Sequence, residues 1–350
     1  MKKYELCGMS RAELESFVQS ELGEKAYRAS QIRSWLMRGA EVQEMTNLPQ
    51  TLRERLQEIA VANPVKIDKC FASRTDGTEK YLYALQDGNL IEGVLMRYRY
   101  GDTLCVSTQV GCRMGCAFCA STLEGRVRDL TPGEMLGQVL AVNRHMRESG
   151  MQKSVHNAVL MGSGEPLDNY ANVMRFLRLL NDPEGLNISL RNVSLSTCGL
   201  VPAMERLAEE GLPVTLSLSL HAPNDAIRKR IMPIANSYTV DQALQACRNY
   251  VNRTGRRVVL EYALIRGVND SLACADELAG RLRGLQCHVN LIPLNDVPER
   301  DLRAPLRREV ESFQKRLEQR HISVTVRREM GADIEGACGQ LRRRVISDRH

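Results

Sequence analysis

Gln109-Val-Gly-Cys-Arg-Met-Gly-Cys-Ala-Phe-Cys-Ala120 decides the fold, because it places three cysteines in a C-x3-C-x2-C spacing. Three thiolates this close, from Cys112, Cys116 and Cys119, can bind three irons of a cubane iron–sulfur cluster. The fourth iron then has no protein ligand. An open iron of this kind suits a small chelating substrate that binds through an amino and a carboxylate group.

Zinc is the main alternative for the same thiols. A structural zinc site needs a fourth cysteine or histidine nearby, commonly from a second C-x2-C pair. No such pair follows, and the next candidate ligand is a single histidine, His145, in an expected helix. The spacing therefore favours a cluster over zinc, and scattered structural thiols come third. The spacing and the aromatic Phe118 resemble the radical-SAM superfamily, whose members bind S-adenosylmethionine at the open iron.

Composition limits the class of protein. The 350 residues are 43% hydrophobic, which is enough for one large domain with an appendage or for two domains. The N-terminus lacks a long apolar run, and no stretch approaches the ~20 apolar residues of a membrane span. We therefore expect a cytoplasmic protein with no membrane partner, whose eleven cysteines serve metal or redox chemistry. The net charge of +6 permits a nucleic-acid partner without establishing one.

The first part of the chain, residues 1–62, has a helical pattern. Ser10-Arg-Ala-Glu13 matches a capping box before an apolar run. Residues 26–38 and 49–60 repeat the helical period. These segments predict a small helical bundle.

The pattern changes after residue 63. Residues 64–99 alternate with a period of two, and turn signals at Asp76-Gly77 and Asp87-Gly88 predict a short antiparallel segment. From about 103 to 300, six apolar strands alternate with helices, which predicts an α/β fold with a parallel sheet curved into a partial or full barrel. The expected strands are 104–109, 157–162, 191–197, 213–219, 257–264 and 287–292, and the expected helices are 132–149, 169–181, 201–210, 239–254, 271–283 and 303–320.

Polar side chains follow the expected strands at the end where α/β barrels place their chemistry. In the Gly-Glu-Pro loop after the second strand, Gly164 lets the backbone approach a ligand, and Glu165 can accept hydrogen bonds from an ammonium group. Taken singly, such groups are better read as caps of the next helix. Polar groups at four strand ends over one cluster are better explained as a ligand cradle. The later strands contribute Ser196, Ser219, His221 and Asn295, of which His221 also fits a structural histidine.

Two further cysteines stand apart from the cluster motif. Cys105 lies on the first expected strand, seven residues before Cys112, and Cys338 lies near the C-terminus. Because Cys338 is flanked by Ala337 and Gly339 in a polar segment, we expect it to be accessible as a nucleophile or a resolving thiol. Spacing alone leaves a buried structural thiol as the simpler interpretation of either cysteine.

Together these segments resemble the RlmN family of dual-specificity 23S rRNA and tRNA adenine-C2 methyltransferases, over nearly the full chain. The resemblance rests on Tyr27-Arg-Ala-Ser-Gln-Ile32, Met45-Thr-Asn-Leu48, Thr103-Leu-Cys-Val-Ser-Thr-Gln-Val-Gly-Cys112, the Gly-Glu-Pro-Leu loop, the Ser-Leu-His-Ala turn and the Ala-Cys-Gly-Gln-Leu tail. It implies a radical-SAM partial (β/α)6 barrel with a small N-terminal helical domain and a short antiparallel β segment. The implied divisions are an N-terminal helical RNA-binding domain at 1–62, a β-hairpin or linker segment at 63–100, the core barrel at 101–300 and a C-terminal extension with the methyl-cysteine loop at 301–350.

The resemblance also implies roles for particular residues. Cys338 carries a methyl group, Cys105 resolves the protein–RNA adduct by forming a disulfide with Cys338, and Glu92 accepts a proton. One departure is Ser163, where the family often has an apolar residue; we expect it to affect packing more than catalysis. The implied cluster ligands are Cys112, Cys116 and Cys119, and the implied S-adenosylmethionine contacts are Gly164, Glu165, Ser196, Ser219, Leu220, His221 and Asn295.

The implied chemistry requires these parts together. Adenine C2 is electron-poor and cannot attack a sulfonium methyl group as a nucleophile, so the family uses a radical. One S-adenosylmethionine methylates Cys338, and a second yields a 5′-deoxyadenosyl radical that takes hydrogen from the S-methyl group. The implied partners of this expected monomer are 23S rRNA in its peptidyl-transferase region, tRNA at an adenine beside the anticodon, and an electron donor such as flavodoxin or ferredoxin.

Two other functions stay open. Cfr-type enzymes use the same two-cysteine logic to methylate C8 of the same rRNA adenine, although Pro166 and the N-terminal helical domain favour C2 by analogy. A noncatalytic RNA-binding metalloprotein would form no deoxyadenosine with reductant and S-adenosylmethionine. In either RNA-binding case the expected phosphate contacts are Arg97, Arg99, Arg113, Arg126, Arg128 and Arg342 to Arg344.

Replacing Cys112, Cys116 or Cys119 by Ala should remove a ligand that the cluster needs. We expect each variant to lose the brown cluster absorbance and all cleavage of S-adenosylmethionine, measured as deoxyadenosine formation. Cys247→Ala, outside the motif, serves as the control. A motif variant that kept full cleavage would exclude that cysteine from the ligand set.

Overall fold

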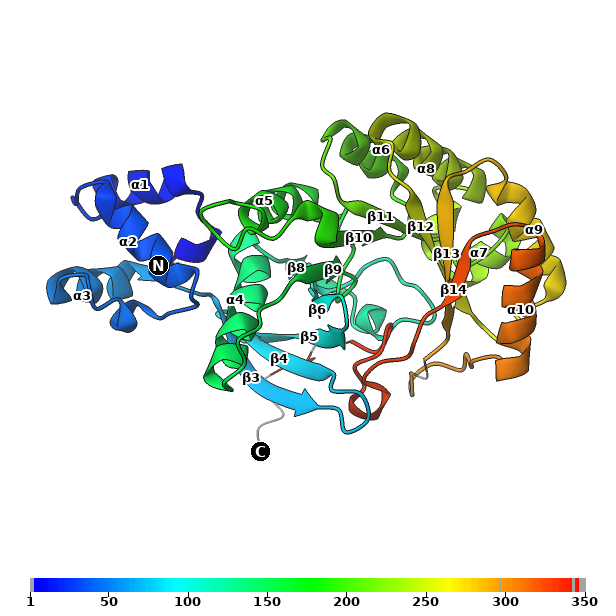
Figure 1. The fold of residues 1–350 in the computed structure, drawn as a ribbon, viewed down its shortest axis with the longest axis horizontal. Helices are drawn as coiled ribbons and strands as arrows, with labels where there is room; N and C mark the ends of the chain where they lie inside the picture. The colour runs from blue at the N-terminus through cyan, green and yellow to red at the C-terminus, as the bar shows by residue number, and fades with distance from the viewer. Residues whose placement is uncertain (1–2, 296, 342–343, 346–350) are drawn as a thin grey trace.

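A computed structural model describes residues 3–295, 297–341 and 344–345, the last two by their backbone. The N-terminal helices α1 (Arg11–Ser20), α2 (Tyr27–Leu36) and α3 (Gln50–Ile59) form a separate group beside the rest of the chain (Figure 1). The predicted capping box is present, since Ser10 Oγ accepts a hydrogen bond from Glu13 N and the Glu13 carboxylate accepts one from Ser10 N. A short parallel pair, β1 (Tyr4–Glu5) and β2 (Ala60–Val61), closes this group and was not predicted.

Most of the remaining strands form one sheet, in the order β14-β13-β12-β11-β10-β9-β6-β5-β4-β3, with β15 also paired to β5. The strands from β14 to β6 are parallel, whereas β5, β4 and β3 continue the sheet antiparallel. The bounds are β3 (Val65–Ala72), β4 (Glu79–Leu85), β5 (Asn89–Tyr98), β6 (Gly101–Cys105), β9 (Asn157–Leu160), β10 (Val193–Thr197), β11 (Thr215–Ser219), β12 (Val258–Leu264), β13 (Cys287–Pro293), β14 (Val324–Val326) and β15 (Arg344–Val345).

The expected α/β fold with a partial barrel is therefore confirmed, with differences at its edges. The antiparallel segment is continuous with the barrel, because β5 pairs directly with β6. The first barrel strand ends at Cys105 rather than at residue 109. Beyond it, Thr108 N and Gln109 N donate to Ser163 O, and β7 (Gln109–Gly111) pairs with β8 (Arg126–Asp129) in a separate ribbon. The domain divisions at 62, 100 and 300 stay predictions.

Helices cover the outer face of the parallel strands (Figure 1). They are α4 (Pro132–Glu148), α5 (Tyr170–Leu180), α6 (Val201–Glu209), α8 (Val240–Thr254), α9 (Leu272–Leu282) and α10 (Arg307–Gln319). The short helix α7 (Asp225–Ile231) lies at the strand ends, where Ile231 O accepts a hydrogen bond from Ala117 N of the cysteine loop. Shorter 3-10 turns are η1 (Leu6–Gly8), η2 (Val42–Glu44), η3 (Ala120–Thr122), η4 (Leu190–Asn192), η5 (Pro233–Asn236) and η6 (Ala332–Ile334). Among the described residues, no helix combines the length and the apolar character needed to cross a bilayer.

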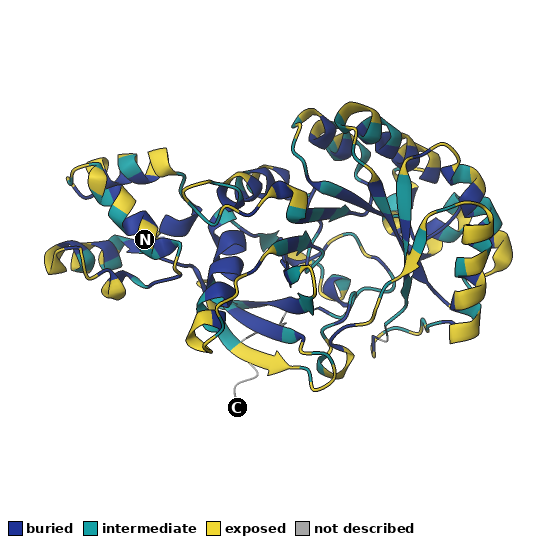
Figure 2. Ribbon diagram, in the orientation of Figure 1, coloured by how far each residue is buried: buried dark blue, intermediate teal, exposed yellow. Residues whose placement is uncertain are grey.

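The two faces of the barrel strands differ in composition. In β10, Val193 and Leu195 are fully buried under the helices, whereas Ser194 and Ser196 alternate with them toward the barrel interior and stay partly exposed. Figure 2 shows the same division, with buried residues between sheet and helices and exposed ones on the outer helix surfaces. Period-two alternation therefore forms the apolar core on one face and leaves a hollow lined by small polar side chains on the other.

Ion pairs fix the N-terminal helices against the barrel. Arg33 is buried and pairs with Asp182 beyond the end of α5, and Arg175 on α5 pairs with Glu13 on α1 at 2.6 Å. Arg144 on α4 also contacts Glu44 at 2.6 Å. Because the first pair is largely removed from water, loss of one partner would leave a buried charge and would cost more than breaking an exposed pair.

Candidate functional site

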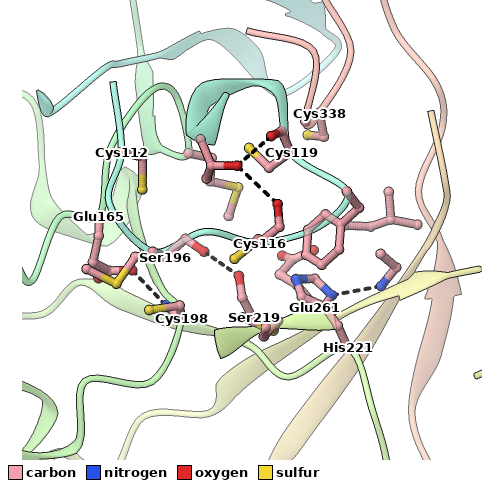
Figure 3. Close-up of a pocket in the computed structure, with 18 of the residues that line it drawn as sticks. Cys112, Cys116, Cys119, Glu165, Ser196, Cys198, Ser219, His221, Glu261 and Cys338 are labelled. Carbon is pink, nitrogen blue, oxygen red and sulfur yellow. Dashed lines mark hydrogen bonds between the residues drawn. The ribbon is translucent and has the colours of Figure 1, made fainter. Parts of the chain in front are cut away.

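The three motif cysteines lie in one loop and line one cavity at the C-terminal ends of the barrel strands (Figure 3). The loop leaves β7 through Gly111, whose φ is +72° and where a Cβ would lie 1.9 Å from Gly125 O, so only glycine fits there. Cys112 N then donates to Gly125 O at 3.1 Å and Ala117 N donates to Ile231 O at 2.9 Å. These contacts hold the loop over the barrel.

The charge state of these thiols depends on what they bind. Burial raises the pKa of Cys112 to about 12, and it raises the pKa values of Cys116 and Cys119 above the ordinary value as well. The thiols are therefore protonated on their own, and the positive charge of bound iron is what stabilises them as thiolates. Three such thiols on one wall and polar strand ends on the other fit a [4Fe-4S] cluster with S-adenosylmethionine beside it.

The glycine loop after β9 packs against the chain that follows β6. Gly164 has φ of +108°, and a Cβ there would lie 2.7 Å from Gln109 Cβ. The next residue, Glu165, is buried, and its carboxylate accepts hydrogen bonds from Cys198 N at 2.8 Å and Leu167 N at 3.1 Å. Burial nevertheless raises the pKa of Glu165. The carboxylate faces the cluster cavity (Figure 3) and would gain from a cationic ligand there.

The ends of β10 and β11 are joined by contacts that the sequence did not reveal. Ser196 Oγ and Ser219 Oγ lie 3.3 Å apart at the cavity. Beneath them Arg228 has no exposed surface, and its guanidinium donates to the carbonyl oxygens of Cys198, Ser219 and Leu220. The cation thereby fixes the strand ends from below. Leu220 is fully buried, and its side chain is absent from the cavity lining.

His221 is held as a neutral ring. Its Nδ1 accepts a hydrogen bond from Ala263 N at 2.9 Å, and the ring meets Phe118 edge-on at 4.9 Å. Burial, aided by the charge of Arg228, lowers the pKa of His221 to about 3. Its φ of +56° is a left-handed conformation that is uncommon outside glycine. The ring therefore forms an uncharged wall of the cavity. Its Nδ1 is used in a hydrogen bond within the protein, as expected for a structural histidine.

The loop that carries Cys338 is attached to the cluster loop through its backbone carbonyls. Ala120 N donates to Gly339 O at 2.8 Å, and Ser121 Oγ donates to Leu341 O at 2.6 Å. Asn295, expected to hold S-adenosylmethionine, lines the cavity and donates from Nδ2 to Cys338 O at 2.9 Å. The amide of Asn295 therefore positions the Cys338 loop.

Ser163, the departure from the family pattern, is part of this connection. Its hydroxyl lies 3.1 Å from Ser121 Oγ, and its amide donates to Ser107 Oγ at 2.9 Å. Because the Ser121 hydroxyl also contacts the C-terminal loop, Ser163 joins the glycine loop to both other loops. The Ser163 hydroxyl is buried and hydrogen-bonded to the Ser121 hydroxyl. The sequence predicted only an effect on packing, whereas the structure shows a polar connection between loops.

A second cavity adjoins the cluster cavity. Cys338 lines both, and Cys105 lines the second. Burial, followed by the proximity of Cys338, raises the pKa of Cys105 to about 12, and the nearby Arg327 opposes this shift. All eleven cysteines are free thiols in the structure, so the implied disulfide between Cys105 and Cys338 is not formed here.

Glu92 lies apart from these cavities. It is almost completely buried on β5, its carboxylate is 3.7 Å from Lys80 Nζ, and it lines neither cavity. Lys80 Nζ also donates to Glu335 O at 3.4 Å, in the Cys338 loop. The structure therefore brings the cluster cysteines, the strand-end groups, Cys105 and Cys338 together and leaves Glu92 outside that set.

Four of the eight arginines expected to contact RNA form ion pairs within the protein. Within the described part of the chain, Arg97, Arg113, Arg126 and Arg128 each pair with at least one carboxylate. Arg99 is exposed. Arg342 and Arg343 lie outside the described residues, and Arg344 is described only as backbone of β15.

Other cavity residues gave no sequence signal. Cys198, interpreted as structural, lines the cluster cavity, as do Glu261 on β12 and Arg327 after β14. Arg327 Nη1 lies 4.0 Å from Glu261 Oε2. Recognising β14 as a seventh parallel strand would have drawn attention to the residue that follows it, but this strand has only three residues.

Comparisons with known proteins agree with this arrangement. The Radical SAM superfamily model matches residues 106–273, and that of the ribosomal RNA large subunit methyltransferase N-terminal domain matches residues 4–62. A probable dual-specificity RNA methyltransferase RlmN from Lachnospira eligens is 50% identical over 332 residues, which is 93% of each chain. One from Alkaliphilus metalliredigens is 49% identical over 99% of this chain and 97% of its own. The solved structure of a radical SAM methyltransferase from Sphaerobacter thermophilus matches with a TM-score of 0.93 and 45% identity, over 97% of this chain and 99% of that chain.

The buried neutral ring of His221 predicts a pH dependence of stability. Its folded pKa of about 3 lies below the ordinary value of 6.5, so the unfolded state takes up the proton first as pH falls. Stability is therefore lost progressively from about pH 6.5 toward pH 3. Between about pH 7.5 and pH 5.5, we expect wild type to lose roughly 1 kcal/mol more unfolding free energy than His221→Gln, measured by urea denaturation. An equal loss in both proteins would contradict a neutral buried ring.

Proposed function

The chain belongs to the RlmN family of radical-SAM RNA methyltransferases, and from this premise we propose that it methylates C2 of adenine in 23S rRNA and in tRNA. The proposed targets are an adenine of the peptidyl-transferase region and the adenine beside the anticodon. Its cofactors are a [4Fe-4S] cluster and S-adenosylmethionine. We further propose that it acts in the cytoplasm as a monomer, with a flavodoxin or ferredoxin as electron donor.

One observation carries this proposal: Cys338 borders both the cavity of the cluster cysteines and the cavity of Cys105. A thiol in this position can receive a methyl group on the cluster side. The same sulfur is then reached by Cys105 from the second cavity. A structural cysteine needs neither arrangement, and a noncatalytic metalloprotein needs only the first.

The proposed ligand contacts follow from the lining of the cluster cavity. Bound together, the cluster and S-adenosylmethionine supply the methyl group and the radical that activates it. Cys112, Cys116 and Cys119 hold the cluster, and Glu165 accepts hydrogen bonds from the ammonium group of the cofactor. Gly164 lines the same cavity, and its missing Cβ lets this loop pack closely on Thr108 and Gln109. The remaining proposed contacts are Ser196, Ser219, His221 and Asn295, which line the cavity, together with Leu220, whose carbonyl accepts a hydrogen bond from Arg228.

Release of the product is the proposed task of Cys105. Its sulfur attacks the Cys338 sulfur, a disulfide bond forms, and the bond between that sulfur and the RNA methylene breaks. The methylene carbon takes up the proton that the Cys105 thiol gives up and becomes the methyl group. Glu92 is the proposed acceptor of the C2 proton, and its pairing with Lys80, which also contacts the Cys338 loop, links it to this region.

Nucleoside mass spectrometry tests the proposed activity directly. Reconstituted protein is incubated without oxygen with reductant, S-adenosylmethionine, and either 23S rRNA fragments or tRNA anticodon stem–loops. We expect adenosine methylated at C2 from both RNAs. Methylation at C8 would assign the Cfr-type reaction instead, and cofactor cleavage without RNA product would refute both.

Cys338 and Cys105 should give opposite phenotypes. Cys338→Ala has no sulfur to receive the methyl group, so we expect neither product nor a protein–RNA adduct. Cys105→Ala forms the adduct but cannot break it, so we expect a covalent species visible as a shifted gel band. Glu92→Gln should slow breakdown of the adduct because C2 must first lose its proton.

Cys287→Ala, a change at a partly exposed thiol outside both cavities, is the control for these variants. Cluster absorbance is measured in each protein to show that the site is intact. Normal turnover by Cys105→Ala, or an adduct in Cys338→Ala, would overturn the assigned roles.

A further inference from the structure

The tip of the hairpin between β5 and β6 presents two aromatic rings. Tyr98 pairs with Gly101, so Arg99 and Tyr100 form a two-residue turn. The rings of Tyr98 and Tyr100 are stacked, with centroids 4.9 Å apart and planes 7° from parallel. Tyr100 is 69% exposed, although a large aromatic side chain usually avoids water. One face of its ring is therefore covered by Tyr98 and the other is open.

The hairpin tip is held in place from below. Gly101 has φ of +127°, and a Cβ at this position would lie 2.8 Å from the ring of His156. His156 N also donates to Asp102 O at 2.9 Å. The exposed ring is thus mounted on a tightly packed turn, which lowers the entropy lost when a ligand stacks on it.

The two tyrosines border a third cavity, which opens at the opposite end of the barrel interior from the cluster. Met161 and Arg327 line this cavity and both of the others. Tyr98 also packs against the apolar group that contains Cys105 and Leu341. The stacked rings therefore lie at the rim of a cavity that shares two wall residues with the cavities of Cys105 and Cys338.

The cavity rim carries exposed arginines, although Glu329 is exposed beside Arg328 and Glu261 faces Arg327 inside the cavity. Arg99 at the hairpin tip and Arg328 at the cavity wall are both exposed. Arg327, half-buried, adds a third cation at the inner end of the cavity. An open aromatic face between cations suits an unpaired nucleobase, whose ring stacks while its phosphates meet the arginines.

We propose that Tyr100, backed by Tyr98, is a stacking platform for an unpaired nucleobase of the RNA substrate that lies a few nucleotides from the target adenine. This assignment rests on the proposed function, because it requires RNA to reach Cys338. It places RNA entry at the β5–β6 hairpin. It also gives the protein a reason to prefer a loop or bulge, since a base within a perfect duplex has no free face to offer.

The test compares variants that distinguish aromatic stacking from apolar contact and from the charge of the neighbouring arginine. Tyr100→Phe keeps the aromatic ring, Tyr100→Leu keeps only an apolar side chain, and Arg99→Ala removes the adjacent charge. The probe is an RNA stem–loop with 2-aminopurine a few nucleotides from an unpaired loop adenine, and its fluorescence reports stacking. Affinity is measured across a range of salt concentrations, with Tm and cluster absorbance as checks of folding.

We expect Tyr100→Phe to bind and quench the probe like wild type. Tyr100→Leu should bind roughly tenfold more weakly, lose the quenching and keep the wild-type salt slope. Arg99→Ala should instead reduce the salt slope and keep the quenching. Wild-type affinity and quenching in Tyr100→Leu would overturn the platform.

Failure of the platform and failure of the proposed function give different results. If wild type methylates the unlabelled stem–loop but Tyr100→Leu binds and quenches normally, the platform is wrong and the function stands. If wild type neither methylates nor binds the RNA, the proposed function is wrong and the platform falls with it.

Discussion

A backbone hydrogen bond from Ala120 N to Gly339 O brings the C-terminal loop onto the cluster loop. Two further contacts, from Ser121 Oγ to Leu341 O and from Asn295 Nδ2 to Cys338 O, reach the same loop. All three acceptors are main-chain carbonyls, so the Cys338 sulfur takes no part in holding its own loop. Its chemical state can change without loss of these bonds. Each bond contributes about 1 kcal/mol net, so the loop is positioned by a few weak bonds while the barrel beneath it has its own core.

The barrel and most of its site could be predicted because their signals are local. Alternation in β10 and β11 sets which serines face inward, and the spacing of Cys112, Cys116 and Cys119 is contained in one loop. Such patterns depend on neighbouring residues alone. The partial barrel and the strand-end groups follow from them.

The features that sequence reasoning missed depend on contacts between distant segments. Arg228 lies in a short basic run that a sequence alone would place in solvent, yet its side chain is fully buried by the carbonyls of two strand ends. β14 has only three residues and is recognised through its pairing with β13. The role of Asn295 toward Cys338 similarly needs the folded path of the C-terminal loop. The periodicity of the sequence does not indicate contacts between segments that are far apart in the chain.

Burial sets the protonation state of the Cys105 thiol. A pKa of about 12 keeps Cys105 protonated near neutral pH, and a protonated thiol is a poor nucleophile. Cys105 and Cys338 both line this second cavity as free thiols. Arg327 opposes the effect of burial on Cys105, so a cation is already present at the point where the reaction needs a thiolate. The proposed attack becomes possible only once Cys338 is joined to RNA, because the Cys338 sulfur then has a carbon partner that the Cys105 sulfur can displace.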